Sequence, residues 1–442
     1  MIKSQKNKEI DRIYQSYLKA EKHQDYFDSD KNKRNPQYTN MILDQLGLNY
    51  NPINILVTGS KGKGSVSKMI SELLLNFNEY IGLFTSPHIE EFNERIQIRN
   101  KVISDDDLVE SIRKVGTIVE EIDSNIPVNK YVSPIGFLVS IAMLYFSKNN
   151  CNINVLECGK GAKYDDVNTL KRDYSVINTI FREHTRELGE TIELIAEDKS
   201  NIIIEGQKYA YSAKQKDSVI KVIKKRALAQ KVELKVYGED FYADNVTISP
   251  KGTTFDVVTR KKRYNNIVLP LLGKHQAENA AIAFQVCEDV IGTFDVELVK
   301  HSMKNINWPG RLEIIGHDPV IILDACINKA SASSVIDILK LIGAEKIGTI
   351  IGVPEDKDYI GISDEMKLIS DFIFLTKSSN PHYKFSEKQL DSLNVEIPSA
   401  YYSNLKEAVL VAKEKVGEKG VVCILGTTSL ITDVKKIKLN ND

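Results

Sequence analysis

The chain has 442 residues, of which 42% are apolar and 27% are charged, a composition typical of folded globular proteins rather than of disordered ones. Its 59 basic and 60 acidic residues nearly cancel, so the net charge gives no reason to expect a nucleic acid or a membrane surface as partner. The length predicts two or three domains of roughly 150 residues each. The first 33 residues are polar and mixed in charge, unlike a secretory signal.

The longest uncharged segment, residues 131–146, contains Ser, Pro and Gly and is too short to span a bilayer comfortably, so we expect a buried helix there. The 5 cysteines are scattered and form no Cys-x-x-Cys pair, which argues against a disulfide framework and against a zinc knuckle. We therefore expect a cytoplasmic protein.

Short apolar segments rich in β-formers alternate with helical patterns through the first part of the chain. The predicted strands are residues 53–58, 80–85, 153–156 and 174–180, with a helix at 66–74. Buried apolar strands separated by helices indicate a mostly parallel sheet with helices on both faces. Between about residues 206 and 272, shorter alternating segments predict an antiparallel excursion.

A second series of strands and helices follows the segment Trp308-Pro309-Gly310-Arg311. Its predicted strands are residues 320–323, 347–352, 372–376 and 421–425, and its predicted helices include residues 333–341 and 405–415. Pro309 and Gly310 suit neither a helix nor a strand, so we place a boundary near residue 306. The prediction is an α/β protein in which a P-loop-type, mostly parallel sheet domain (residues 1–306) precedes a smaller Rossmann-like domain (residues 307–442).

A glycine-rich loop directly follows the first strand and opens the first helix of the sheet. It consists of Gly59, Ser60, Lys61, Gly62, Lys63, Gly64 and Ser65. Such a loop lets backbone N–H groups converge on phosphate oxygens, and the helix N-terminus adds a partial positive charge. Lys63 could reach the β- and γ-phosphates of ATP, and the Ser65 hydroxyl suits Mg²⁺. The full Walker pattern is broken because position 57 is Val, so a glycine-rich turn with incidental lysines is the structural alternative.

Five further blocks follow the loop in order. They are Thr85-Ser86-Pro87-His88 with Phe92-Asn93-Glu94-Arg95-Ile96; Leu156-Glu157-Cys158-Gly159 with Asp165 and Asn168; His184-Thr185 with Leu188-Gly189-Glu190-Thr191 and Ile195-Ala196-Glu197-Asp198-Lys199; Leu272-Gly273-Lys274-His275-Gln276 with Glu278 and Asn279; and Trp308-Pro309-Gly310-Arg311-Leu312-Glu313. Together with the loop, these blocks resemble the Mur ligase superfamily, and within it the folylpolyglutamate synthase/dihydrofolate synthase branch. The resemblance extends from about residue 35 to the C-terminus.

The resemblance implies an ATP-dependent, ADP-forming amide ligase. Such an enzyme converts a carboxylate into an acyl phosphate, which an amine then attacks, so most of the work lies in placing and neutralising phosphate charge. The implied cofactors are ATP and Mg²⁺ at two sites, and the implied partners are a small carboxylic acid and an amino acid. We expect a monomer.

The resemblance also assigns roles to single residues. Magnesium ligands would be Ser65, Ser86, Glu157, His184 and Lys199; nucleotide contacts beyond the loop would be His275, Gln276, Asn279, Arg311 and Asp324; and the catalytic set would be Lys63, His184, Lys199 and Arg311. Structural alternatives remain open for most of them: a helix cap for Glu157, a turn residue for Ser86, a structural histidine for His184, a surface ion pair for Arg311, and helix-start polarity for His275, Gln276 and Asn279.

The predicted helix at residues 191–200 places Lys199 on an apolar face. Ile192, Ile195, Ala196 and Lys199 share this face at i, i+3, i+4 and i+7, while Glu193 and Glu197 lie opposite. Burial lowers the pKa of a lysine, and the neutral amine can then capture carbon dioxide. The family resembled here carries a carbamylated lysine fifteen residues after its magnesium histidine, which is the separation of Lys199 from His184. A snorkelling lysine with an exposed amine is the alternative.

The chain departs from the family pattern mainly at positions linked to the substrates. Ile327 and Lys329 replace the usual His and Pro after Asp324, Asp166 replaces a small residue in the region that handles the pterin, Lys160 replaces Leu, and Arg182-Glu183 stands where Asp precedes the histidine. Three hypotheses therefore remain: a folate-directed ligase that adds glutamate, a paralogue that joins a non-folate acid to another amine, and a nucleotide-binding protein that has lost catalysis. A carboxylate at position 166 is expected to repel an anionic substrate and to attract a cationic one.

Overall fold

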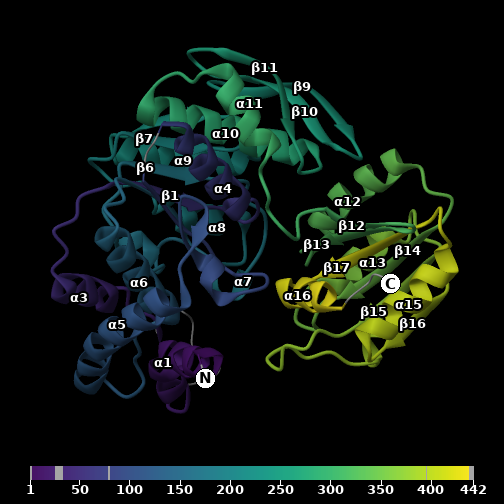
Figure 1. Cartoon of the computed structure of the whole chain (residues 1–442), viewed down its shortest axis with the longest axis horizontal. Helices are drawn as coiled ribbons and strands as arrows, with labels where there is room; N and C mark the ends of the chain where they lie inside the picture. The colour runs from purple at the N-terminus through teal and green to yellow at the C-terminus, as the bar shows by residue number, and fades with distance from the viewer. Residues whose placement is uncertain (1, 25–32, 78–79, 395, 438–442) are drawn as a thin grey trace.

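The computed structural model describes residues 2–24, 33–77, 80–394 and 396–437, which form two α/β units (Figure 1). Within these residues the first sheet has 8 strands in the order β4-β3-β2-β5-β1-β6-β7-β8. The bounds are β1 Ile53–Thr58, β2 Ile81–Phe84, β3 Ile96–Ile98, β4 Lys101–Val102, β5 Ile153–Glu157, β6 Tyr174–Ile177, β7 Tyr209–Ser212 and β8 Glu233–Val236. All pairings from β2 to β8 are parallel, and β3 and β4 add an antiparallel edge.

Helices cover both faces of this sheet, as the alternation of apolar segments predicts. One face carries α1 (Ile2–Glu21), α3 (Gln37–Leu46), α5 (Asp105–Asn125), α6 (Pro134–Lys148), α8 (Ile192–Ser200) and α9 (Asp217–Ala229). The other face carries α4 (Lys63–Leu74), α10 (Lys274–Ile291) and α11 (Val296–Lys304). Short helical turns η1 (Leu75–Phe77), η2 (Phe92–Arg95), η3 (Val167–Thr169) and α7 (Thr185–Leu188) connect the longer elements.

The uncharged segment at residues 131–146 forms most of α6, and this helix is buried almost throughout. Ser133 caps its N-terminus by accepting a hydrogen bond from the Gly136 N–H, and Pro134 occupies the first turn, where its missing N–H costs nothing. The prediction of a buried helix is confirmed. In residues 2–24, 33–77, 80–394 and 396–437, no helix combines the length and the apolar character that crossing a bilayer requires.

The excursion predicted from residue 206 begins later than expected. Residues 206–236 form β7, α9 and β8, which extend the parallel sheet. The antiparallel part is confined to β9 (Tyr242–Ser249), β10 (Gly252–Val258) and β11 (Arg263–Leu269), which form a separate sheet. The prediction that the excursion starts at residue 206 was wrong. The strand β7 has only four residues and is paired with β6, so its sequence is too short to show a clear periodicity.

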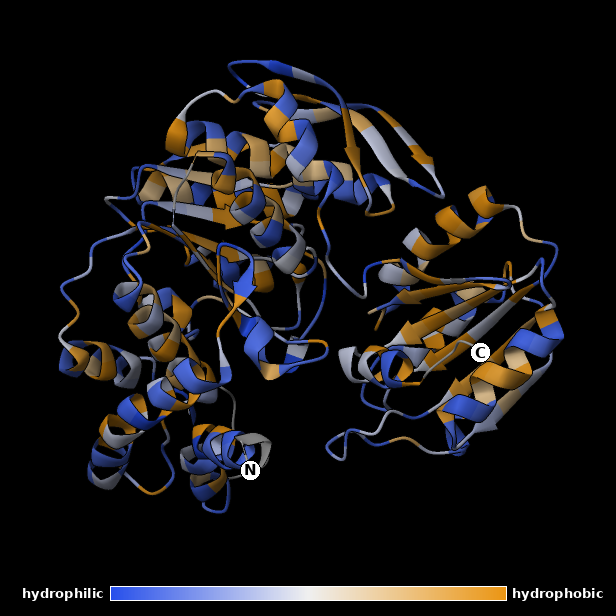
Figure 2. Cartoon of the chain, in the orientation of Figure 1, coloured by the Kyte–Doolittle hydropathy of each residue, from blue (hydrophilic) through white to orange (hydrophobic). Residues whose placement is uncertain are grey.

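The second unit contains a 6-stranded sheet in the order β12-β13-β17-β14-β15-β16. Its strands are β12 Glu313–His317, β13 Val320–Asp324, β14 Ile347–Gly352, β15 Phe372–Thr376, β16 Ser399–Tyr402 and β17 Val421–Gly426. Its helices are α12 Lys329–Ile342, α13 Tyr359–Met366, α14 Lys388–Asp391, α15 Leu405–Val416 and α16 Thr428–Lys436. The strands are largely apolar, and the helices beside them carry both hydrophobic and hydrophilic residues (Figure 2). The boundary that we propose near residue 306 lies between α11 and β12.

The two units touch through side chains of the first that enter the core of the second. Leu272 before α10 belongs to the apolar cluster that α12 and α13 form with the second sheet, and Ile248 on β9 packs against this cluster. The linker residue Leu312 joins the same cluster. The first unit therefore contributes directly to the packing of the second, which fixes the cleft between them.

Asp166 lies in a buried polar network rather than on a substrate-facing surface. Its Oδ2 accepts hydrogen bonds from Arg34 Nη2 at 2.8 Å and from Ser133 Oγ at 2.5 Å, and its Oδ1 accepts one from Thr39 Oγ1 at 2.8 Å. Only 3% of its side chain is exposed. The expectation that this carboxylate repels or attracts a substrate is therefore wrong, because Arg34 neutralises it inside the protein. The network ties α3, α6 and η3 together.

We expect Asp166→Ala to lower the free energy of unfolding by about 3–5 kcal/mol, because it leaves the Arg34 guanidinium buried without this carboxylate. Urea denaturation measures the change. Asp44→Ala, at an exposed position of α3, is the control and should change the free energy of unfolding by less than about 0.5 kcal/mol. A loss no larger than that of the control in Asp166→Ala would contradict a structural role.

Candidate active site

The glycine-rich loop lies between β1 and α4 and is held against the end of β6. The N–H groups of Ser60 and Lys61 donate to Thr179 O at 2.9 and 3.4 Å, and Lys63 Nζ donates to Gly59 O at 2.9 Å. Gly62 has a φ of 78°, and a Cβ at this position would lie 2.3 Å from Asn178 Nδ2. Only glycine fits this turn, which leaves the N-terminus of α4 open toward the cleft.

Two of the residues predicted to contact the nucleotide hold the side chain of Asn178, which lies against Gly62 of the glycine-rich loop. Asn279 Oδ1 accepts a hydrogen bond from Asn178 Nδ2 at 2.9 Å, and Asn279 Nδ2 donates to Gln276 Oε1 at 3.1 Å. Gln276 and Asn279 are 2% and 5% exposed. Asn178 was missed in the sequence, although its place directly after a buried strand was a usable signal.

Glu157 ends β5 and forms the centre of the first group of predicted magnesium ligands. Its Oε2 accepts a hydrogen bond from the Ser86 N–H at 3.1 Å. The carboxylate therefore contacts the Ser86 loop rather than capping a helix. Burial raises the pKa of Glu157 to about 7, against the opposing charges of Lys63, Arg311 and Arg95 and the Ser86 hydrogen bond. Ser65 is 2% exposed, and its Oγ has no hydrogen-bond partner in the described part of the chain.

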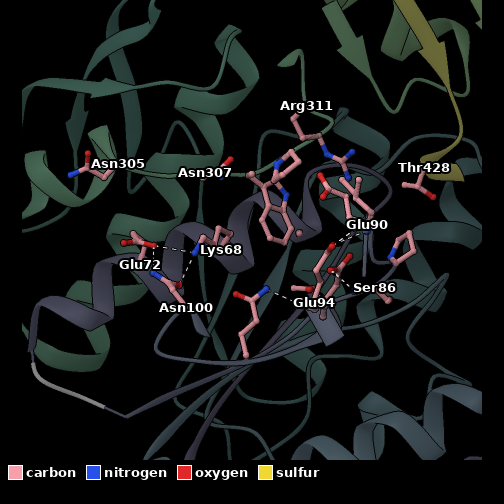
Figure 3. A pocket seen from close by; sticks show the side chains of 18 residues that line it. Lys68, Glu72, Ser86, Glu90, Glu94, Asn100, Asn305, Asn307, Arg311 and Thr428 are labelled. Atoms are coloured by element: carbon pink, nitrogen blue, oxygen red, sulfur yellow. Dashed lines mark hydrogen bonds and ion pairs between the residues drawn. The ribbon is translucent and has the colours of Figure 1, made fainter. Parts of the chain in front are cut away.

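A cavity of about 460 Å³ opens beside this group, between the first unit and the linker (Figure 3). Arg311 enters it from the linker, with Nη1 donating to Gly310 O at 3.1 Å. Its wall includes Ser86, Glu157, Trp308 and, from α16, Thr428. Trp308 packs against Gly64, where a Cβ would come within 3.0 Å of the indole ring. The sequence motif assigns no role to Trp308, and the structure places its side chain in the wall of the cavity.

The second group of predicted ligands lies around Glu183. Lys199 is fully buried, and its Nζ lies 3.1 Å from Glu183 Oε1, 3.1 Å from Gly59 O and 2.5 Å from Lys160 O. An exposed, snorkelling amine is therefore excluded. Burial and the charge of Lys63 together lower the pKa of Lys199 to about 8, against the opposing effect of Glu183.

His184 adopts a left-handed backbone conformation at the start of α7, with a φ of 45°. Its side chain is 28% exposed, and its Nε2 lies 4.0 Å from Glu183 Oε2. Burial lowers the pKa of His184, with the charge of Glu183 acting in the opposite direction. Lys63 acts electrostatically on both Glu157 and Lys199, and its Nζ donates to the same Gly59 O as Lys199 Nζ does.

A second cavity, of about 420 Å³, lies between the glycine-rich loop and α12 of the second unit. The first unit contributes Lys61, His275 and Asn279, and the second contributes Ala330 and Ser334. Burial lowers the pKa of His275 to about 3, helped by Lys61 and Arg311, so its ring is neutral at physiological pH.

Asp324, a predicted nucleotide contact, has a hydrogen-bond partner in the linker. Its carboxylate is 5% exposed, and its Oδ2 accepts a hydrogen bond from the Leu312 N–H at 2.9 Å. The residue thus anchors the linker, and a contact with nucleotide stays a prediction.

A third cavity, of about 650 Å³, separates His184 from the second unit. Ile327 is on its wall, at the position where the family pattern has a histidine. Asp356, Lys357 and Asp358, which follow β14, complete the opposite side, and sequence reasoning missed them. The signal was again a run of polar residues after a buried strand.

The residues present fit ATP and Mg²⁺. The glycine turn and the open N-terminus of α4 form a cradle for phosphate, while the partnerless Ser65 hydroxyl and the Glu157 carboxylate offer oxygen ligands. Within the described residues no three His, Cys, Asp or Glu side chains gather into a metal site. Mg²⁺ commonly takes one or two carboxylates and completes its shell with water and substrate phosphates, so this donor set suits it.

Comparison with known proteins agrees with this arrangement. Residues 57–287 match the Mur ligase middle domain. The dihydrofolate synthase/folylpolyglutamate synthase of Bacillus subtilis (strain 168) is 27% identical over 388 residues, which cover 86% of this chain and 89% of that protein. The folylpolyglutamate synthase of Mycobacterium tuberculosis, crystallised with ADP and AMPPCP, is 25% identical and superposes with a TM-score of 0.86 over 93% of this chain and 97% of the other.

A solved complex of a folylpolyglutamate synthase (FPGS) with AMPPCP and folate is also similar, with 25% identity and a TM-score of 0.81 over 92% of this chain and 95% of the other. The family match spans about half of the chain and contains the glycine-rich loop, Glu157, His184 and Lys199. The chain therefore belongs to the Mur ligase family, and the relatives it resembles are folylpolyglutamate synthases.

Proposed function

We propose that the protein is an ATP-dependent, ADP-forming amide ligase that joins glutamate to a folate-type carboxylate. The observation that carries this proposal is the presence of Glu157 and Arg311 in one cavity beside the glycine-rich loop, where the charge of Lys63 also acts on Glu157. These are the charges that phosphoryl transfer to a carboxylate needs, since its catalysis is mainly positioning and neutralisation. The similarity to folylpolyglutamate synthases along most of the chain supports the choice of substrates.

Each of the three cavities can bind a different part of the substrates. We assign the nucleotide base to the cavity of His275 and Asn279, the acid to the cavity of Glu157 and Arg311, and the amine to the cavity of His184. Lys63 would draw the γ-phosphate toward the carboxylate, and Arg311 would neutralise charge from the linker side. Mg²⁺, held by Ser65, Ser86 and Glu157, would supply further charge neutralisation at the phosphates. The neutral His275 ring can contact a base without repelling Lys61.

Lys199 is proposed to carry a carbamate in the active enzyme, with His184 as its partner at a second magnesium site. In the structure the Lys199 ammonium donates to Gly59 O and Lys160 O and forms an ion pair with Glu183, so carbamylation is expected to require Glu183 to move away. The carbamate would place a new anionic oxygen near Lys63. The low pKa of Lys199 favours the reaction because carbon dioxide reacts with the neutral amine.

A paralogue with another amine is the second candidate, and Ile327 is the observation that favours it. The residue is half-exposed in a cavity whose other walls carry Arg182, Glu183 and Lys357. An apolar group there removes a polar contact beside the incoming amine. A protein that has lost catalysis is a weaker candidate, because the loop lysine, Glu157 and Arg311 all remain.

The proposed function is tested by ADP release with folate-type acids, glutamate, Mg²⁺ and bicarbonate present. Wild type should release ADP only when acid and amino acid are both supplied. Lys63→Ala should retain less than a tenth of that activity, which corresponds to more than about 1.4 kcal/mol in the barrier, because the γ-phosphate loses its cation. Lys225→Ala, on the exposed face of α9, is the matched control and should keep full activity.

Unfolding by urea should show Lys63→Ala as stable as wild type within about 0.5 kcal/mol, since a loop lysine adds little packing. Activity above a tenth in this variant would remove Lys63 from its role. Absence of folate-dependent ADP release in wild type, together with release on another acid or amine, would favour the paralogue.

The carbamate should increase with pH at constant dissolved carbon dioxide. Below a pKa of about 8 Lys199 is an ammonium ion that cannot react, and above it the neutral amine dominates. Carbon-13 NMR with labelled bicarbonate should show a resonance that grows between about pH 7 and pH 9. Lys199→Ala should lack this resonance and lose activity, with partial recovery when formate or acetate is added.

Glu183→Gln sharpens this test because it removes the carboxylate that holds the ammonium form. The variant should show more carbamate than wild type at pH 7. A spectrum in which wild type and Lys199→Ala do not differ at pH 9 would refute carbamylation.

Ile327→His distinguishes the two amine hypotheses. If glutamate is the amine, the substitution should leave ADP release with glutamate unchanged or raise it, because it restores a polar contact. If the site suits another amine, an unpartnered imidazole would cost roughly 1–3 kcal/mol. Activity on that amine should then fall about tenfold, measured as kcat/KM across a panel of amino acids. Ile327→Leu is the control for side-chain volume, and a tenfold loss with glutamate in the His variant alone would contradict the first hypothesis.

A further inference from the structure

A lysine of the second unit joins two segments that carry predicted site residues. Lys435, in the last turn of α16, places its Nζ 3.2 Å from Glu90 Oε1 and 2.9 Å from Glu313 Oε1. Its side chain is only 16% exposed. Glu90 belongs to the loop after β2 that contains Ser86, and Glu313 follows Arg311 by two residues.

The carboxylate of Glu313 also binds Gly310, the residue that precedes Arg311. Glu313 Oε2 accepts a hydrogen bond from the Gly310 N–H at 2.7 Å. Gly310 O in turn accepts one from Arg311 Nη1 at 3.1 Å and one from the Ala325 N–H at 3.1 Å. One carboxylate thus links the ammonium of Lys435 to the backbone that orients the arginine.

Glu90 lies in a loop whose backbone is held by several hydrogen bonds. The carboxylate of Glu94 accepts hydrogen bonds from the N–H groups of Ile89 at 2.8 Å, Glu90 at 2.9 Å and Glu91 at 2.6 Å. Thr432 Oγ1 of α16 also donates to Ile89 O. These contacts hold residues 89–94 together, and Glu90 lies only four residues from Ser86 along the chain. A displacement of Glu90 is therefore expected to shift Ser86.

Ion pairs of this exposure contribute little to stability. Glu90 is 55% exposed and Glu313 is 26% exposed, and solvent weakens the attraction in pairs near the surface. Geometry is more sensitive, since a displacement of about 1 Å at a reacting group can cost about a hundredfold in rate. The contribution of Lys435 is therefore expected in turnover rather than in stability.

We propose that Lys435 is a positioning residue, whose ammonium holds the Ser86 loop and the Arg311 linker in the one arrangement in which both face Glu157. The effect on turnover rests on the proposed function, while the effect on the loop does not. Nothing in the arrangement requires Lys435 to touch a substrate.

Turnover is measured as ADP release in Lys435→Met, Lys435→Arg and Lys436→Met. Lys435→Met should lower kcat about tenfold and change the KM for ATP less than about twofold, because the loop that binds phosphate is left intact. Lys435→Arg should keep at least about half of the wild-type kcat, since a guanidinium can hold both carboxylates. Lys436→Met, at the exposed neighbouring position, is the matched control and should behave as wild type.

Amide hydrogen exchange of residues 86–94 gives a readout that is independent of activity. Exchange should be faster in Lys435→Met than in wild type and unchanged in Lys436→Met. If wild type releases no ADP but exchange responds in this way, the proposed function fails and the positioning contact stands. Faster exchange with an unchanged kcat would overturn the positioning role, and so would unchanged exchange. If Lys435→Met does not fold, Glu90→Gln applies the same tests, with a smaller loss of kcat expected.

Discussion

The ammonium group of Lys63 acts on two buried ionisable groups, Glu157 and Lys199, and shares the Gly59 carbonyl oxygen with the second of them. On one side it opposes the effect of burial on Glu157, and on the other it adds to the effect of burial on Lys199. Its position depends on the hydrogen bond to Gly59 O and on the turn at Gly62, which fits only against Asn178. The end of β6 and α10 therefore help to determine where the charge sits, because Asn178 directly follows β6 and Asn279 belongs to α10.

Neither α/β unit holds a complete site. The glycine-rich loop and Glu157 belong to the first unit, Arg311 to the linker, and Ile327 and Lys357 to the second. Leu272 packs in the core of the second unit and Ile248 packs against it, while cavities lined by both units lie elsewhere along the contact. Such a design makes turnover depend on how the units are held, since a charge 1 Å out of place loses much of its effect in the transition state.

Asp166 illustrates how a polar residue in a substrate-linked motif can serve the fold instead. A buried carboxylate needs a cation or several hydrogen bonds, and Arg34, which lies 132 residues away in the sequence, supplies the cation. The motif around residue 166 contains no sign of that partner. Reading the position by family analogy therefore suggested a substrate contact, whereas the packing of α3 against α6 required the carboxylate.

The sequence by itself determined the alternation of strands and helices, the phosphate loop, the antiparallel excursion in outline and the buried face of α8 with Lys199. These follow from local regularities, because apolar periodicity states which face of an element is buried and glycine states where the backbone turns. Only the tertiary structure decided what covers each buried face: Glu183 for Lys199, Asn279 for Asn178 across 101 residues, and Glu313 for Lys435 across 122. The physical reason is that burial of a polar group demands a partner without specifying it, and the partner is selected by the packing of elements distant in the chain.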